Sequence, residues 1–422
     1  GQQYKAADAA DRAKRVLERA YQRSRALPDA PTRARASCAM ASIAVENGQN
    51  ARAKELWNEG LRELPAEPAY ALDRSYCFKE ASFVSRHIGA GPEAISYLLA
   101  AREELKRAPY HSRVADLSAL LDLAESYRGD GQLQQAVATS EEADALMKAL
   151  GRNETQRAGT LFNNWALTLN LLGRELEAEK IFRRAIEIGK ASEGEDAVSP
   201  MLLLNYGRVL SALGRDREGN DYVHRARDRA KQAGLAVVVL QSLFVQNAIH
   251  RNLNELDQAS RVIEELAPLN RRLYPAGHVA FASEASLRSL TAYARGEWRE
   301  ALRLGDLAVN LTEECIESRQ EGKDFLPTLL TRRSQFRLKL DDVAGALADA
   351  QRSYELLRAS RPADSFSSDL GRACLALGRA MQAQGEREEA QNLYRAATEH
   401  LRSSLGNAHP LTAEAVRLAV SR

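Results

Sequence analysis

The sequence has little of what marks membrane proteins and β-rich proteins. No apolar run reaches the roughly 18 residues that a membrane-spanning helix needs, and no stretch resembles a signal peptide. Aromatic residues make up only 6% of the chain, and runs of Val, Ile and Thr that alternate with polar residues are absent. We therefore expect an all-α protein in the cytoplasm, with no membrane partner.

Cysteine and histidine are also sparse, and neither is clustered. No CxxC pair occurs, and no His stands at metal-ligand spacing from another His or Cys. We therefore expect no metal and no cofactor, and we interpret the cysteines as buried free thiols in a reducing compartment. The four cysteines are Cys38, Cys77, Cys315 and Cys374.

The charges of the chain nearly cancel. Charged residues make up 27% of the chain, yet the formal net charge is only +2. A nucleic-acid-binding protein usually carries a clustered basic face, so we expect no nucleic-acid partner. Only 11 of the 59 basic residues are Lys, and a preference for Arg is typical of GC-rich bacterial genomes.

Motifs for catalysis are missing as well. The stretch GAGPEA, residues 89–94, formally fits a dinucleotide-binding fingerprint, but it follows the helical segment YCFKEASFVSRHI instead of a strand. The chain has no P-loop, no G-x-S-x-G elbow and no Cys/His dyad. We therefore expect that the protein is not an enzyme.

What the sequence does contain is a repeat. The stretch LGRELEAEKIFRRAIEIG, residues 172–189, places Gly173, Ala178, Phe182 and Ala185 at a spacing that recurs along the whole chain. The first position of each copy is Gly, Asn or Asp, the residues that best tolerate a positive φ. These residues are Gly48, Gly89, Gly131, Gly173, Gly214, Asn254, Gly296, Asp341 and Gly385.

Each first position is followed at fixed distances by residues that are small, with the one exception of Leu266. Five positions later stand Ala53, Ala94, Ala136, Ala178, Gly219, Ala259, Ala301, Ala346 and Ala390. Twelve positions later stand Gly60, Ala101, Ala143, Ala185, Ala226, Leu266, Ala308, Ser353 and Ala397. This pattern predicts that a left-handed residue ends one helix, and that small residues let the next helix pack closely against it.

The period predicts the organisation of the chain. An additional second helix at the start, DRAKRVLERA, places Ala13 at the first small position, and the copies then follow every 42 residues or so up to Ala390. We expect one solenoid over residues 1–422. Its predicted parts are the second helix of an incomplete repeat at 1–30, nine helical hairpins at 31–405 and a capping helix at 406–422. The charged stretch 313–328 coincides with the longest period and is expected to be a long loop between repeats.

The pattern G-x4-A-x3-aromatic-x2-A resembles the tetratricopeptide repeat. Because the period exceeds the usual 34 residues, the chain looks most like the long repeats of kinesin light chain and of bacterial signalling proteins. The resemblance implies an α-α superhelix. HEAT repeats share the period but lack the spacing from Gly to Ala, so they remain a weaker alternative.

The resemblance also implies a binding surface. In such a superhelix the first helix of each pair lines the concave wall, and its exposed positions lie 10, 9, 6, 3 and 2 residues before the turn residue. Asn side chains there can bind a peptide backbone, and Arg can bind carboxylates through two hydrogen bonds. The family's Lys/Asn/Arg clamp for a free C-terminus is not matched. The candidate peptide-binding residues are Arg128, Asn163, Asn164, Asn170, Asn205, Arg208 and Arg251.

Two functions follow as hypotheses. The first is a non-catalytic scaffold that binds a peptide or a partner helix in its concave groove. The second is the sensor or regulatory region of a larger bacterial signalling protein, behind a Ser/Thr kinase or a transcriptional regulator. The second hypothesis rests on the start of the chain, which opens on a second helix with no first helix or polar cap before it.

Overall fold

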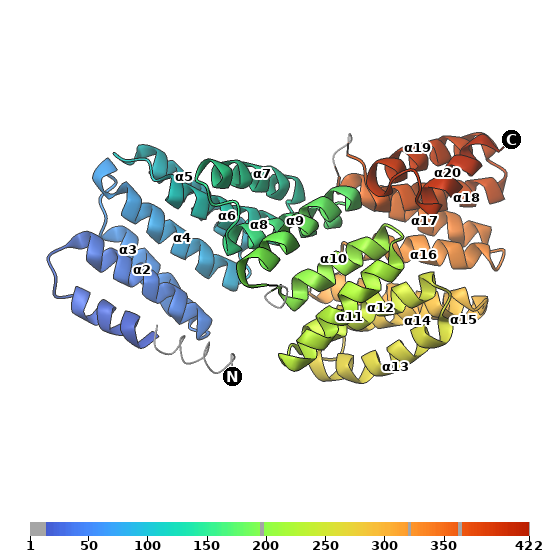
Figure 1. The fold of residues 1–422 in the computed structure, drawn as a ribbon, viewed down its shortest axis with the longest axis horizontal. Helices are drawn as coiled ribbons and strands as arrows, with labels where there is room; N and C mark the ends of the chain where they lie inside the picture. The colour runs from blue at the N-terminus through green and yellow to red at the C-terminus, as the bar shows by residue number, and fades with distance from the viewer. Residues whose placement is uncertain (1–13, 195–197, 320–321, 362–364, 422) are drawn as a thin grey trace. The chain divides into compact units, whose positions relative to one another are not determined.

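The structure is a computed structural model, which describes residues 14–194, 198–319, 322–361 and 365–421 (Figure 1). Every regular element in this part of the chain is a helix, which confirms the all-α prediction. The chain divides into two compact units, residues 1–154 and 155–422, here called the N-terminal unit and the C-terminal unit. Each is described by itself, and the single solenoid over residues 1–422 stays a prediction.

The N-terminal unit consists of antiparallel helix pairs. Residues 14–24 are helical, in the segment where the sequence predicts a lone second helix, and residues 1–13 lie outside the described part. A short 3-10 helix, η1 (Pro68–Tyr70), precedes the second pair. The pairs are α2 (Ala30–Glu46) with α3 (Asn50–Arg62), α4 (Ala71–His87) with α5 (Gly91–Arg107), and α6 (Arg113–Gly129) with α7 (Leu133–Ala149).

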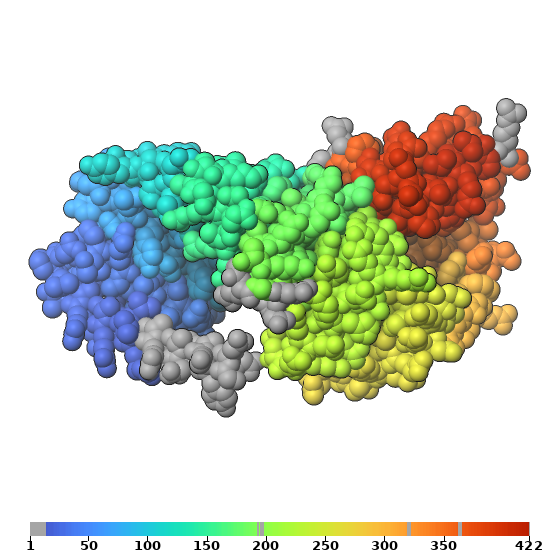
Figure 2. All heavy atoms as spheres, in the orientation of Figure 1, coloured from blue at the N-terminus to red at the C-terminus, as the bar shows by residue number. Residues whose placement is uncertain are grey.

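The C-terminal unit continues the same arrangement and ends on a single helix, α20 (Pro410–Val420). Its pairs are α8 (Gln156–Leu171) with α9 (Glu175–Glu193), α10 (Pro200–Ala212) with α11 (Asp216–Gln232), α12 (Ala236–Asn252) with α13 (Leu256–Leu273), α14 (Val279–Ala294) with α15 (Trp298–Arg319), α16 (Leu326–Leu338) with α17 (Val343–Ala359), and α18 (Ser368–Gln384) with α19 (Arg387–Leu405). Figure 2 shows α10 to α14 packed into one continuous surface.

The turn and packing positions of the repeat are confirmed. All nine turn residues have positive φ, from 59° at Asp341 to 103° at Gly385. The small residues that follow them by five and by twelve positions are all buried. A residue without a bulky side chain at these sites lets two helices approach closely, so the pattern in the sequence is the pattern of contact in the core.

The long loop expected at residues 313–328 is wrong for most of that stretch. Helix α15 extends to Arg319, and α16 already begins at Leu326. The charged residues at 313–319 therefore belong to a helix longer than its counterparts. An exposed helix face is as rich in charge as a loop, so the charge of this stretch does not by itself predict irregular structure.

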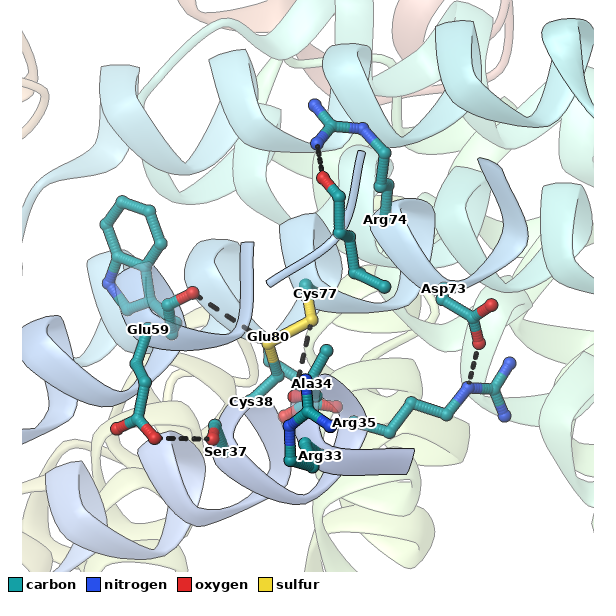
Figure 3. The surroundings of a disulfide bond; sticks show 12 residues. Arg33, Ala34, Arg35, Ser37, Cys38, Glu59, Asp73, Arg74, Cys77 and Glu80 are labelled. Atoms are coloured by element: carbon teal, nitrogen blue, oxygen red, sulfur yellow. Dashed lines mark hydrogen bonds and ion pairs between the residues drawn. A yellow bond between two sulfur atoms is a disulfide. The ribbon is translucent and has the colours of Figure 1, made fainter. Parts of the chain in front are cut away.

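The interpretation of all cysteines as free thiols is also wrong. Cys38 on α2 and Cys77 on α4 form a disulfide, with 5.3 Å between their Cα atoms (Figure 3). The inference of a reducing compartment therefore loses its basis for these two residues. Cys374 is a buried free thiol, as expected, and Cys315 is buried with its sulfur 3.0 Å from the carbonyl oxygen of Gly277.

Gly60 explains why the disulfide fits between the helices. It occupies the position where most repeats have Ala, and a Cβ atom added there would lie 2.4 Å from the sulfur of Cys38 and 2.7 Å from the carbonyl oxygen of Ala34. The sulfur therefore occupies the space of the missing methyl group. The combination of Gly at this position with two cysteines 39 residues apart is the signal that the sequence offered for the bond.

We predict that replacing both Cys38 and Cys77 by Ser lowers the free energy of unfolding of the N-terminal unit by about 4 kcal/mol, because the bond closes a loop of 39 residues. Hydrogen exchange in increasing urea, read on peptides from α2 and α4, measures this loss. Dithiothreitol should weaken the natural chain and leave the double variant unchanged. An equal response of both would contradict the prediction.

Candidate functional site

The inner wall of the C-terminal unit is built from the first helix of each pair. Each of these helices packs against its own partner and also contacts the first helix of the next pair, from α8 through α10, α12, α14 and α16 to α18. The side chains that these helices turn away from their partners therefore share one concave surface. The predicted candidate residues Asn163, Asn164, Asn170, Asn205, Arg208 and Arg251 all lie on α8, α10 and α12.

The superhelix of this unit closes on itself. The backbone N–H of Ser368, where α18 begins, donates to the carbonyl oxygen of Gly173 in the turn after α8, at 2.9 Å. Helix α9 also contacts α19. Leu213, in the turn after α10, packs against the core cluster of α18, α19 and α20 that includes Leu401 and Ala415. Repeats almost 200 residues apart are thus held together across one turn of the superhelix.

Gly173 fits this closure for two reasons. Its φ of 72° is one that a residue with a side chain rarely adopts. In addition, a Cβ atom at this position would lie 2.5 Å from the hydroxyl oxygen of Ser367 and 2.9 Å from the backbone nitrogen of Ser368. Asn254 and Asp341 also have a positive φ although they carry side chains, so the φ alone does not require Gly. At Gly173 the close contact with Ser367 and Ser368 is a second reason for Gly.

A buried carboxyl group takes part in the same closing contact. Glu175, at the start of α9, is bonded to the hydroxyl of Ser368. Burial is the main cause that raises the pKa of Glu175 to about 7, and the nearby charge of Asp369 raises it further, while the Ser368 hydroxyl and Arg372 act in the opposite direction. The carboxyl group is therefore close to its titration point at neutral pH.

Three of the predicted asparagines form one hydrogen-bonded ladder. Asn205 donates from Nδ2 to Oδ1 of Asn163 at 3.3 Å, and Asn163 donates to Oδ1 of Asn164 at 3.1 Å. The Nδ2 group of Asn164 has no acceptor among the described residues and remains a donor on the inner wall. The ladder joins α8 to α10, so its geometry is fixed by helix packing.

Asn205 differs from the expectation of an exposed groove residue. Only 3% of its surface is exposed, because Leu203 and Leu204 draw this part of α10 into the core. Asn205 therefore orients Asn163 and is not itself a contact surface. Asn163, Asn164 and Asn170 are half-buried, and the side chain of Asn170 makes no hydrogen bond in the described part of the chain.

The two predicted arginines of this unit are held in the wall without carboxylate partners. Arg208 on α10 makes no ion pair with any described residue. Arg251 on α12 donates from Nε to Oδ1 of Asn247 at 3.1 Å, and Asn247 is anchored to the carbonyl oxygen of Ala259. Burial lowers the pKa of Arg208 and lowers that of Arg251 to about 10.

Two further arginines lie on inner helices of this unit and were not among the predicted residues. Arg332 on α16 donates to the hydroxyl of Ser286 at 2.7 Å, and Arg372 lies on α18. Burial lowers the pKa of Arg332 to about 9, and the positive charges of Arg251 and Arg372 lower it further, against a smaller opposing effect of Asp369. Arg332 lies 9 residues before its turn residue, at a position that the repeat register assigns to the inner wall, whereas Arg372 lies 13 residues before its own and falls outside that register.

Arg128 lies in the other unit. It is on α6, where its Nε atom is buried without a hydrogen-bond partner in the described residues. The inner helices of that unit pair their charges with one another: Lys79 of α4 lies 3.2 Å from Asp122 of α6, and Arg86 lies 3.4 Å from Glu125. No group of three or more His, Cys, Asp or Glu side chains in the described part could hold a metal ion.

A second hollow lies between α11, α12 and α13 of the C-terminal unit. Apolar side chains such as Val239, Pro268 and Leu269 line it. Of its charged groups, Lys231 and Glu265 lie 3.6 Å from each other, and Arg272 also lines it. Among the described helices none is long and apolar enough to cross a membrane.

Comparison with known proteins identifies the fold. No family model matches the chain, and no curated protein matches its sequence. A solved structure of a Rap protein complexed with competence and sporulation factor has a TM-score of 0.57 at 15% identity, over 84% of this chain and 95% of that one. This chain is a tetratricopeptide-type helical repeat array.

Two further structures show the same tetratricopeptide-type architecture. The apo form of the quorum sensor NprR from B. thuringiensis has a TM-score of 0.56 at 13% identity, over 86% of this chain and 97% of that one. A human IFIT1 dimer with m7Gppp-AAAA has a TM-score of 0.50 at 13% identity, over 91% of this chain and 80% of that one. At these identities the likeness concerns the fold alone.

We predict that the stability of the C-terminal unit falls as pH rises. The pKa of Glu175 in the folded protein lies above its ordinary value of 4.5. Its stabilising contribution to the free energy of unfolding is therefore fully present below pH 4.5 and is lost as pH rises through about 7. The free energy of unfolding should drop by about 2–3 kcal/mol more between pH 5 and pH 8 in the natural chain than in Glu175→Gln. Urea unfolding at both pH values measures it, and parallel pH dependence would contradict it.

Proposed function

We propose that the C-terminal unit is a non-catalytic interaction module that binds an extended peptide or a partner helix along its inner wall. The observation that carries this proposal is the hydrogen-bonded amide ladder on α8 and α10, which leaves the Nδ2 donor of Asn164 without a protein acceptor. Asn163 and Asn164 would bond a peptide backbone, and Asn205 would keep Asn163 in place. Arg208 and Arg251 would contact acidic groups of the same ligand.

The geometry supports this function because the polar groups are already oriented. A ladder fixed by helix packing loses little conformational freedom when a ligand binds, so more of the interaction energy appears as affinity. A wall made of rigid helices also positions donors more accurately than loops do. Asn170, near the end of α8, would extend the contact, and Arg128 stays a candidate peptide-binding residue of the N-terminal unit.

The sensor hypothesis has support of its own. One of the similar structures is described as a quorum sensor, and another is complexed with a competence and sporulation factor. We infer that a ligand of the inner wall could regulate a partner protein or an effector domain in the bacterial cytoplasm. Recognition and sensing are then two aspects of one site, because a ligand regulates a protein when it binds two of its conformations with different affinity.

We predict that the full chain captures a partner from an extract of the source cells and that the variant carrying Asn164→Ala, Asn205→Ala and Arg208→Ala loses it. Removing the ladder and one arginine should weaken binding by about tenfold or more, since each hydrogen bond to the ligand is worth about 1 kcal/mol. Mass spectrometry of the captured proteins and peptides identifies the partner, and titration with it measures the affinity.

Asn310→Ala, on an exposed position of the outer helix α15, is the matched control and should capture the partner normally. Circular dichroism should show that the triple variant keeps its helix content. Equal capture by the natural chain and a folded triple variant would place the partner elsewhere on the surface. Recovery of RNA instead of a peptide or protein would reject the proposed class of partner.

A further inference from the structure

The arginines of the inner wall are arranged differently in the two units. In the N-terminal unit, cations on one inner helix lie beside carboxylates on the next, as in the pairs Lys79–Asp122 and Arg86–Glu125. Within the described residues of the C-terminal unit, Arg208, Arg251, Arg332 and Arg372 form no ion pair. The first unit leaves Arg128 without an ion pair but pairs Lys79 and Arg86, whereas the second leaves four arginines without one, and this excess charge calls for a physical reason.

The contacts of these arginines hold them in place without neutralising them. Arg332 is bonded to the hydroxyl of Ser286, and Arg251 to the amide oxygen of Asn247. Both partners are neutral and buried. These bonds fix one edge of each guanidinium group, while the remaining N–H groups keep their capacity to donate. Buried charges without counter-ions cost free energy, so this arrangement lowers the stability of the protein when no ligand is bound.

The nearby carboxyl groups do not supply the missing charge. Asp369 on α18 is engaged by Arg361, whose Nη2 lies 2.9 Å from its carboxylate. Glu175 is bonded to the hydroxyl of Ser368 at the closure of the superhelix, and burial raises its pKa to about 7. Arg332 and Arg372 therefore stand without a counter-ion on the contacting helices α16 and α18, and Arg251 stands without one on α12, which like α16 contacts α14.

We propose that Arg251, Arg332 and Arg372 form an anion site on the inner wall, which binds the carboxylate side chains of an acidic peptide. The proposal rests on the function proposed above and names the chemistry of its ligand. The planar guanidinium group pairs with a carboxylate through two parallel hydrogen bonds, and several such groups would hold two or more acidic side chains. The amide ladder of α8 and α10 would bind the backbone of the same peptide.

The surroundings favour a peptide over a single-stranded nucleic acid. Binding of single strands depends on aromatic side chains that stack on successive bases. Helix α18 has no aromatic residue, and Phe336 of α16 is fully buried. Tyr206 of α10 packs against Tyr222 and donates its hydroxyl hydrogen to Glu179. The helices that carry Arg332 and Arg372 therefore offer no exposed aromatic side chain on which bases could stack.

The test measures the binding of an array of N-acetylated octapeptides to the full chain. Each sequence is made in an Asp/Glu form and in an Asn/Gln form, with either a free or an amidated C-terminus, and an eight-nucleotide uridine RNA and inorganic phosphate serve as other anions. We expect acidic forms to bind by fluorescence anisotropy, whether or not the C-terminus is amidated. Arg332→Gln with Arg372→Gln should weaken this binding by about ten- to hundredfold and remove the preference over the neutral forms.

A structural role of the arginines would give a different result. Removing buried like charges should leave the melting temperature unchanged or raise it by about 2–4 °C, whereas removing a structural ion pair would lower it. Arg303→Gln with Arg358→Gln, on exposed outer positions of α15 and α17, lowers the net charge equally and should bind like the natural chain. A lower melting temperature with unchanged affinity would overturn the proposal.

Two other outcomes would also overturn it. Neutral peptides that bind as well as acidic ones, with loss of binding in Asn164→Ala, would preserve the proposed function and reject the anion site. Tighter binding of the RNA or of phosphate than of any acidic peptide, lost in the arginine variant, would keep a basic site but reject its proposed ligand. If no acidic peptide of the array binds, acidic peptides are rejected as the ligand.

Discussion

The structure depends above all on the close approach of two helices at small residues. The two helices of each pair are joined by a left-handed turn residue, and a buried small residue follows it by five positions, as at Gly173 and Ala178. A methyl group of extra bulk at such a contact would push the helices apart. Because the contact recurs with an almost constant spacing, small local angles add up to a superhelix.

The constraint also determines where polar residues can lie. Small residues occupy the interface between paired helices, so the longer polar side chains of the first helices are directed to the inner wall. In the C-terminal unit the curvature brings α12, α16 and α18 close enough for the charges of Arg251, Arg332 and Arg372 to act on one another. The charged cluster is thus a product of the curvature, and the closing contact between Ser368 and Gly173 maintains it.

Much of the fold was predictable, because the features that determine it are local. The positive φ of Asn254 and Asp341 follows from residue type and position, and so does the burial of Ala178. The disulfide between Cys38 and Cys77 was missed, because widely spaced cysteines carry no signal unless Gly60 is considered with them.

The candidate site was only partly predictable. The register identified Asn163, Asn164 and Arg251, but it placed Asn205 on the surface, whereas α10 is buried there. Arg332 and Arg372 join the site through long-range closure of the superhelix, and the helices that carry them are far from α12 in sequence. Position in the repeat therefore locates a residue on a helix, whereas the curvature of the whole unit decides which helices share a site.

The closure between the turn after α8 and the start of α18 has a consequence for access to the inner wall. Since Ser368 is bonded to Gly173 and α9 contacts α19, successive turns of the superhelix leave no lateral gap at this point. A ligand can pass at this point only where the seam opens, and such passage would be slow because hydrogen bonds and packed side chains must first separate.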